Sequence, residues 1–276
     1  MNVDLIDNQR LAYAAQHLSH CMLCEHRCGV NRRQGEHGPC KAGLQARVFR
    51  HRVEYGEEIE IIPSHLFYLS GCDLRCAFCI AEANAFNPSI GTELTAKFLA
   101  DALAQGRRHG ARNIQWVGGE PTIHLPAILE AMSGCAELPP VVWKSDFYGT
   151  PEAFALLDNV VDVYVADFKF GNDACAKRLA KVDRYVDTVT RNLSIAAGQG
   201  NLIIRHLLLP GHFDCCYRPI VDYVARELPA AKFSIRDGYL PRWQARHYGE
   251  LAHPLDAEVA ARAVKLAASS GLNIVE

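Results

Sequence analysis

The sequence lacks a long apolar run, a marked excess of one charge and a low-complexity tract, and each absence narrows what the protein can be. No apolar stretch approaches the roughly 20 residues that a membrane span requires. The 29 basic and 31 acidic side chains leave a formal charge of −2, so the whole molecule has no strong attraction to nucleic acid. With 49% hydrophobic residues over 276 positions, the chain is not disordered. Residues 1–5 lack the pattern of a secretory signal, and we expect a cytoplasmic protein.

What the sequence does contain is an unusual number of cysteines, eleven in all. A reducing compartment disfavours structural disulfides, and an odd total argues further against a full disulfide framework. Seven cysteines fall into two tight groups, within 21–40 and within 72–79, and the other four are scattered. Gaps of two or three residues suit a shared metal centre, because several thiolates must converge on one point.

The composition and the hydrophobic periodicity of the sequence change near residue 60. Residues 1–20 suggest a short helix, and residues 21–60 show little hydrophobic periodicity. We therefore expect 1–60 to be a helix and a small cysteine-rich module that needs a bound metal for its stability. In 61–276, six strand patterns alternate with helical patterns, which predicts an α/β fold. We expect a partial (β/α)6 barrel of parallel strands, with functional groups just beyond the strand carboxyl ends. The expected strands are 65–70, 113–117, 141–145, 161–166, 202–209 and 232–236, and the expected helices are 92–110, 123–133, 151–158, 173–181, 184–198, 217–228 and 256–270.

Three cysteines follow the first expected core strand directly. Cys72, Cys76 and Cys79 form a C-x3-C-x2-C motif. Three thiolates can hold a cubane iron–sulfur cluster and leave its fourth iron without a protein ligand, and such an open position makes a metal reactive. A zinc knuckle with a distant fourth ligand and a reactive thiol cluster are the alternatives, but the strand context and the spacing favour the cluster.

With this motif the sequence resembles the radical S-adenosylmethionine (SAM) enzymes. In particular it is similar to the pyruvate formate-lyase activating-enzyme-like branch, including paralogues with an extra N-terminal four-cysteine motif, and the resemblance covers nearly the whole chain. It implies that Cys72, Cys76 and Cys79 are the catalytic ligands of a [4Fe-4S] cluster. It also implies that Phe78, the aromatic residue before the last cysteine, packs near the adenine of SAM.

Two further matches stand after the second and third expected strands. Gly118, Gly119, Glu120 and Pro121 match the segment that receives the SAM amino group. Two glycines leave bare backbone for close approach, and a carboxylate suits an ammonium group. Ser145 lies where the family often carries a Thr-Asn pair that touches SAM, and its hydroxyl can still form a hydrogen bond.

The fourth, fifth and sixth strands carry the remaining matches. Asp167 and Lys169 match a D-x-K motif whose lysine meets the SAM carboxylate, and an ordinary structural ion pair is the alternative. Arg205 begins an R-x4-P-G stretch and is expected to point into the barrel, either toward SAM or as a structural arginine. His206 should face the helices as a satisfied core histidine, and Tyr239 is a candidate for contact with SAM or substrate.

The N-terminal cysteines Cys21, Cys24, Cys28 and Cys40 have the spacing C-x2-C-x3-C-x11-C in a segment too small for its own core. Four thiolates fit a closed structural zinc or a fully ligated [4Fe-4S] cluster. The paralogues carry a similar motif, and we prefer a second cluster because a second redox centre suits electron delivery. Residues 21–53 hold seven Lys/Arg against two acids, which we interpret as compensation for thiolate charge rather than as nucleic-acid binding.

The four scattered cysteines give weaker signals. Cys135 and Cys175 lie at or within expected helices and are expected to be small buried hydrophobes. Cys215 and Cys216 follow the fifth strand, on the face expected to be active. Our hypothesis is that this pair supplies a hydrogen atom or a thiolate to a radical intermediate, and an ordinary helix start is the alternative. The histidines show no ligand spacing that we would interpret as a metal site.

The resemblance implies an enzyme in which the reduced cluster cleaves SAM to a 5′-deoxyadenosyl radical, which abstracts hydrogen from a protein or metabolite substrate. It implies a reducing partner such as flavodoxin or ferredoxin. An activase that installs a glycyl radical on a partner enzyme is a narrower alternative. Against it, Ile80-Ala81-Glu82 stands where activases usually carry a polar residue followed by Asn. A non-catalytic iron–sulfur protein, acting in electron transfer or binding, is the alternative of another class.

Overall fold

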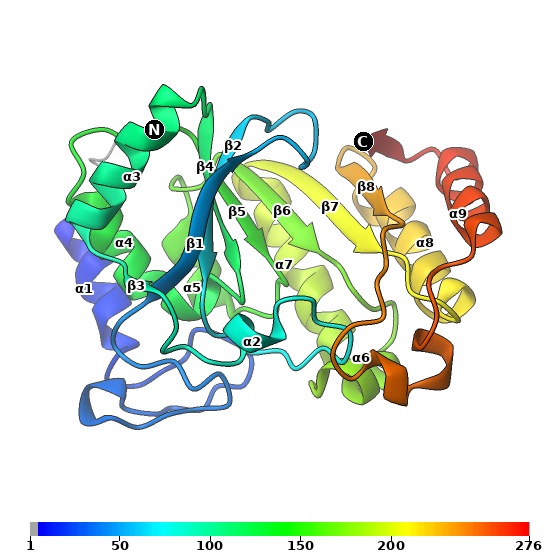
Figure 1. The fold of residues 1–276 in the computed structure, drawn as a ribbon, viewed down its shortest axis with the longest axis horizontal. Helices are drawn as coiled ribbons and strands as arrows, with labels where there is room; N and C mark the ends of the chain where they lie inside the picture. Colours follow the sequence, from blue (N-terminus) through cyan, green and yellow to red (C-terminus); the bar gives the residue numbers. More distant parts are fainter. Residues whose placement is uncertain (1–4, 276) are drawn as a thin grey trace.

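The computed structural model describes residues 5–275, and a single curved sheet organises them (Figure 1). Its strands are β1 (Arg47–Glu54), β2 (Ser64–Leu69), β3 (Thr92–Glu93), β4 (Asn113–Gly118), β5 (Val141–Ser145), β6 (Val163–Asp167), β7 (Asn201–Leu207), β8 (Lys232–Arg236) and β9 (Asn273–Val275). They lie in the order β3-β1-β2-β4-β5-β6-β7-β8-β9. From β2 to β9 every neighbouring pair is parallel, and β1 pairs antiparallel with both β2 and β3. The carboxyl ends of the parallel strands therefore meet at one edge.

Helices connect the parallel strands and cover the outer side of the sheet (Figure 1). The α-helices are α1 (Asn8–Gln16), α2 (Glu82–Ala85), α3 (Ala96–Arg108), α4 (Leu125–Ser133), α5 (Pro151–Leu157), α6 (Asp173–Ala180), α7 (Tyr185–Gln199), α8 (Arg218–Glu227) and α9 (Ala257–Ser269). Several begin at a side chain that accepts a hydrogen bond from an otherwise unpaired backbone N–H. Thr95, Thr150 and Asn172 cap α3, α5 and α6 in this way. Within the described residues, no helix is long and apolar enough to cross a membrane.

Alternation along the strands decides which side chains reach the barrel interior. Val142, Val165 and Ile203, from β5, β6 and β7, meet in an inner apolar cluster. Two residues further along the same strands stand Lys144, Asp167 and Arg205, which line a cavity. Since successive side chains of a strand point to opposite faces, the apolar cluster forms a floor and the charged layer lies above it.

Two carboxylates that precede β2 neutralise this charged layer. Glu57 Oε2 accepts hydrogen bonds from Lys144 Nζ at 2.5 Å and Arg205 Nη1 at 3.1 Å. Glu58 is fully buried, and its Oε1 accepts from Ser234 Oγ at 2.9 Å and Arg236 Nη2 at 2.6 Å. Burial raises the pKa of Glu58, but the nearby cations Arg205, Lys144 and Arg236 outweigh it, so this pKa lies below its ordinary value.

The expected α/β fold with a mainly parallel sheet is confirmed, and it is consistent with a partial barrel. All six expected core strands are present, as β2 and β4–β8. The expectation of little regular structure in 21–60 was wrong, because β1 extends the sheet from that segment. Strand β9 was also missed, since three residues give too short a pattern. The N-terminal helix is shorter than 1–20, and residues 1–4 lie outside the described part. The domain division at residue 60 stays a prediction.

We predict that Glu58→Gln lowers the free energy of unfolding by about 2 to 4 kcal/mol, because it leaves Arg236 and Arg205 short of a buried counter-charge. Urea denaturation followed by tryptophan fluorescence would measure this, since Trp116 and Trp143 are fully buried. The matched control is Glu60→Gln, whose pair with Lys232 is partly exposed to solvent and is expected to contribute less than about 1 kcal/mol. Equal losses in the two variants would contradict the prediction.

Candidate active site

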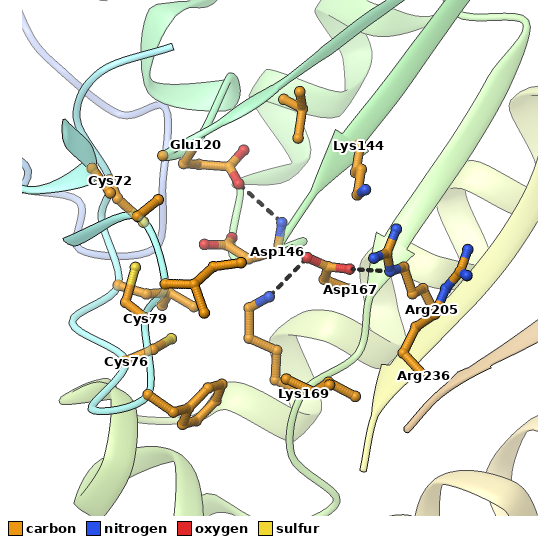
Figure 2. Close-up of a pocket in the computed structure, with 18 of the residues that line it drawn as sticks. Cys72, Cys76, Cys79, Glu120, Lys144, Asp146, Asp167, Lys169, Arg205 and Arg236 are labelled. Carbon is orange, nitrogen blue, oxygen red and sulfur yellow. Dashed lines mark hydrogen bonds and ion pairs between the residues drawn. The ribbon is translucent and has the colours of Figure 1, made fainter. Parts of the chain in front are cut away.

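The three-cysteine loop begins where β2 ends and rests on α6. Arg75 N donates to Ala180 O at 3.0 Å, and Ala77 N donates to Leu179 O at 2.7 Å. Both acceptors lie at the carboxyl end of α6. Cys72 and Cys76 are buried and Cys79 is half-buried. Figure 2 shows their side chains on one side of a cavity, opposite the charged residues of β6 and β7.

The cavity has a volume of about 510 Å³ and lies at the carboxyl ends of the parallel strands. It brings together almost every site residue expected from the sequence. Those that line it are Cys72, Cys76, Phe78, Cys79, Gly118, Gly119, Glu120, Ser145, Asp167, Lys169 and Arg205. Pro121 is buried behind this wall, and the four N-terminal cysteines lie outside the lining. Tyr239 also lines the cavity.

The two glycines after β4 permit a close approach of two backbone segments. Gly118 has a φ of +125°, and a Cβ atom at Gly119 would stand 1.7 Å from Gly71 O. Gly119 N donates to Leu69 O at 2.7 Å, and Glu120 N donates to Gly71 O at 2.9 Å. No larger residue fits at Gly119 without displacing the backbone just before Cys72.

Glu120 is buried, and its carboxylate has protein partners. Oε1 accepts from Thr122 N at 2.9 Å and from Ser145 Oγ at 2.8 Å, and Oε2 accepts from Asp146 N at 2.9 Å. Burial and the nearby Asp146 carboxyl raise the pKa of Glu120 to about 8. The hydroxyl of Ser145 is therefore occupied by Glu120 rather than free to meet a ligand.

Two neighbouring carboxyls were not singled out from the sequence. Asp73 and Asp146 are buried, and each has one carboxyl oxygen without a hydrogen-bond partner. One oxygen of each lies within 4.8 Å of the other and of Cys72 Sγ. Burial raises the pKa of both groups, for Asp73 to about 7, and each is raised further by another nearby acid. Asp146 lines the cavity, so this wall suits a ligand that brings a positive charge.

The opposite wall holds an ion pair. Lys169 Nζ lies 2.9 Å from Asp167 Oδ2, and Arg205 Nε lies 3.8 Å from Asp167 Oδ1 (Figure 2). Burial opposes ionisation of Asp167, but Lys169 and Arg205 outweigh it and lower its pKa to about 2. Burial likewise opposes the charge of Lys169, but Asp167 and Cys76 raise its pKa above the ordinary value. Both charges therefore persist at the cavity wall.

The aromatic residues and His206 complete the surroundings. Phe78 makes edge contacts with Phe170 and Tyr239, at ring-centroid distances of 6.1 and 6.5 Å. Tyr239 donates to Leu251 O at 2.7 Å, which fixes its ring at the cavity edge. His206 is the satisfied core histidine that strand alternation predicts, because it is buried and Nδ1 lies 2.7 Å from Phe168 O. Burial lowers its pKa to about 4.

Two of the N-terminal cysteines, Cys21 and Cys40, lie beside the buried guanidinium of Arg32. Arg32 Nη2 lies 3.1 Å from Cys21 Sγ and 4.0 Å from Cys40 Sγ, and Nη1 donates to Ile123 O at 2.7 Å. This contact agrees with the interpretation that basic residues here offset thiolate charge. Burial raises the pKa of Cys24, and the nearby Asp73 raises it further. The N-terminal group and the cavity thus share Asp73 as a neighbour.

Comparison with known proteins identifies the family. Residues 66–224 match the radical SAM superfamily. The chain belongs to this superfamily. It is 36% identical over 263 residues to an uncharacterized protein of Methanocaldococcus jannaschii, MJ0674. The alignment covers 92% of this chain and 76% of that protein.

Solved structures support the fold. Streptococcus suis SuiB aligns with TM-scores of 0.53 in its SAM complex and 0.52 in its complex with the precursor peptide SuiA, each at 17% identity over 74% of this chain. The chain spans less than half the length of SuiB, 46% to 47%. Membership of the superfamily implies a radical SAM enzyme that uses a [4Fe-4S] cluster and SAM. The residues present fit both groups, because three thiols without a fourth stand beside a cavity with carboxyls on one wall and an ammonium on another.

We predict that, in protein without added SAM, the contribution of Glu120 to stability is lost as pH rises from about 5 to about 8. The folded pKa of Glu120 lies above its unfolded value near 4.3, so the folded state binds more protons in this window, and each pH unit costs up to about 1.4 kcal/mol. Urea unfolding of wild type and Glu120→Gln at pH 5.5 and 7.5 would measure the slope. The substitution should flatten it, whereas Glu137→Gln, at an exposed ion pair, should not. If the free energy of unfolding depends on pH equally in all three proteins, Glu120 does not have the raised pKa on which the prediction rests.

Proposed function

We propose that Cys72, Cys76 and Cys79 hold the reactive cluster and that SAM lies in the 510 Å³ cavity beside it. The observation that carries the proposal is the convergence of three thiols, a buried acid wall and the Asp167–Lys169 pair on one cavity. When bound, the cluster and SAM supply the electron transfer and the 5′-deoxyadenosyl radical. SuiB, which shares the fold, binds SAM in its crystal structure.

Each wall of the cavity suits a different part of SAM. The Lys169 ammonium is positioned to bind the SAM carboxylate; Asp167 holds this ammonium in place, and Arg205 in turn pairs with Asp167. The carboxyl oxygen of Asp146 that has no partner is positioned to accept from the SAM amino group, alongside the backbone of Gly118 and Gly119. Phe78, braced by Phe170 and Tyr239, offers its ring to the adenine. The packed aromatic side also excludes water from a reactive radical.

The rim of the cavity favours a substrate larger than SAM. Ile80 and Leu240 line the cavity and are 74% and 51% exposed. Two apolar side chains on the lip of an active site suit contact with a peptide segment or an apolar metabolite. We therefore propose hydrogen abstraction from a protein or metabolite substrate. SuiB, which shares the fold, has been crystallised with its precursor peptide, and this supports a peptide as one candidate substrate.

An activase of a glycyl-radical enzyme is the second candidate. It is favoured by the Asp167-Phe168-Lys169 motif and by Arg205, with Pro210 and Gly211, because both motifs resemble those of the activating-enzyme branch. The residues after Cys79 depart from that branch. A glycyl-radical signal in electron paramagnetic resonance, after incubation with a glycyl-radical enzyme and SAM, would support this candidate.

We predict that anaerobic, reconstituted protein with SAM and a strong reductant forms 5′-deoxyadenosine, and that Cys76→Ala abolishes this. Lys169→Met should keep the iron but weaken SAM binding by about 10- to 100-fold, the loss of one charge-assisted hydrogen bond. Lys177→Met is the matched control, because Lys177 pairs with Asp183 in an exposed ion pair outside the cavity.

The variants also separate an enzyme from an electron-transfer protein. Full activity of Lys169→Met would refute the assigned SAM site. No 5′-deoxyadenosine from iron-loaded wild type, with or without candidate substrates, would favour the non-catalytic alternative.

For the N-terminal group we propose a second [4Fe-4S] cluster rather than zinc. Ligands of a single ion crowd together, whereas the thiolates of a cubane bind separate irons and stand further apart. Among residues 5–275, no three of Cys21, Cys24, Cys28 and Cys40 bring their sulfurs within 4.8 Å of one another. The wider spacing supports the cluster.

The N-terminal group also adjoins the loop of the first cluster. Arg75 Nη2 donates to Pro39 O and Nη1 to Cys72 O, both at 2.6 Å, so one guanidinium bridges the two cysteine segments. His26 Nε2 lies 2.9 Å from Asp73 O. Such proximity suits electron delivery from a reducing protein such as flavodoxin or ferredoxin. The excess of Lys and Arg in 21–53 favours an acidic donor.

We predict about eight irons per chain in reconstituted wild type and about four in Cys24→Ser. Elemental analysis of both proteins would measure iron and zinc together. Cys135→Ser is the control, because Cys135 is buried apart from both groups and its thiol lies 3.5 Å from Ala131 O. About four irons in wild type, with loss of zinc in Cys24→Ser, would show a zinc site instead.

A further inference from the structure

A third group of metal-binding side chains lies outside the cavity and outside the N-terminal module. The start of α6 contributes Cys175, and the segment after β7 contributes His212, Cys215 and Cys216. One ligand atom of each residue lies within 4.8 Å of the others. None of the four lines the cavity, so the hypothesis that Cys215 and Cys216 serve a radical intermediate gains no support.

We propose that these four side chains bind one tetrahedral zinc ion. Around zinc with bonds of about 2.3 Å to sulfur and 2.0 Å to nitrogen, a tetrahedron has edges of about 3.8 Å between sulfurs and 3.5 Å between sulfur and nitrogen. Cys175 Sγ lies 3.9 Å from Cys215 Sγ, and Cys215 Sγ lies 4.0 Å from Cys216 Sγ. His212 Nδ1 lies 3.4, 3.4 and 3.7 Å from the sulfurs of Cys175, Cys215 and Cys216. The group is too compact for a cubane and has the size of a single-ion site.

Hydrogen bonding alone does not account for this convergence. One ring nitrogen carries either one hydrogen or one lone pair, so His212 Nδ1 cannot satisfy three sulfurs at once. The other nitrogen, Nε2, lies 3.3 Å from Arg178 Nη2 and 3.6 Å from Glu250 Oε1, and these two side chains also pair with each other.

The surrounding backbone is arranged to bring the thiols together. Asn172 Nδ2 donates to Cys215 O at 2.6 Å and lies 3.2 Å from Cys175 Sγ and 3.5 Å from Cys216 Sγ, as suits thiolates. A Cβ atom at Gly171 would stand 2.3 Å from Cys216 O, so only glycine allows the two loops to meet. A π-helical turn, Phe213–Tyr217, carries Cys215 and Cys216, and such turns are frequent at functional sites.

The first test is the metal content of the complete protein, purified without chelator. We expect wild type to contain one zinc per chain more than Cys175→Ser or Cys216→Ser, with iron unchanged, and Cys135→Ser to match wild type. Zinc content that is the same in wild type and both variants would overturn the proposal. Loss of iron from these variants with zinc unchanged would also overturn it. The N-terminal test concerns other variants and a different metal, so the two proposals can fail independently.

Two further measurements test the proposal even if the serine variants fold poorly. His212→Cys should retain zinc, and the cobalt-substituted form should show a shifted visible spectrum because a fourth sulfur replaces nitrogen. In wild type, the exposed thiol of Cys215 should resist iodoacetamide until EDTA is added, as mass spectrometry of the peptides would show. An unshifted cobalt spectrum, or equal alkylation of Cys215 with and without EDTA, would refute zinc ligation.

Discussion

A chain of ion pairs through the barrel interior links the fold to the site. It runs from Glu57 to Arg205 at 3.1 Å, from Arg205 to Asp167 at 3.8 Å and from Asp167 to Lys169 at 2.9 Å. A charge in a barrel needs a partner, since desolvation is otherwise costly. The carboxylates before β2 therefore do more than stabilise the fold. By neutralising Arg205 and Lys144, they leave Asp167 to hold the ammonium of Lys169 at the cavity wall.

The three cysteine groups differ in how their sulfurs are spaced, and our proposals of different metals rest on this difference. The ligand atoms of Cys175, His212, Cys215 and Cys216 lie within 4.8 Å of one another, close enough for the single tetrahedral ion that we propose. In the part of the chain that the structure describes, neither Cys72, Cys76 and Cys79 nor any three of the N-terminal cysteines are as compact. Wider spacing is what a cubane requires, because each thiolate binds a different iron. The same residue type thus serves different chemistry according to geometry that the sequence spacing does not fix.

The sequence predicted the parallel strands and the positions that line the cavity, because strand ends of a parallel sheet converge. It did not reveal that the Ser145 hydroxyl donates to Glu120 while one carboxyl oxygen of Asp146 has no hydrogen-bond partner, since this depends on how two adjacent side chains are oriented. It missed Glu57 and Glu58 because their partners lie about 90 to 180 residues away on other strands. His212-x2-Cys215-Cys216 was a local signal for the third group, but Cys175 comes from helix α6, which lies earlier in the chain.

The third metal group also has a structural link to the first cluster loop. Cys175 stands in the first turn of α6, and the last turn of the same helix accepts hydrogen bonds from Arg75 N and Ala77 N. A metal at Cys175 would fix one end of α6, and the other end supports the loop that carries Cys72, Cys76 and Cys79. A shift of about 1 Å in a reactive group is enough to impair catalysis. Lys169 lies two residues before Gly171, which packs against Cys216 in the third metal group. A rigid α6 would therefore help to keep the three thiols of the first cluster loop correctly placed relative to Lys169.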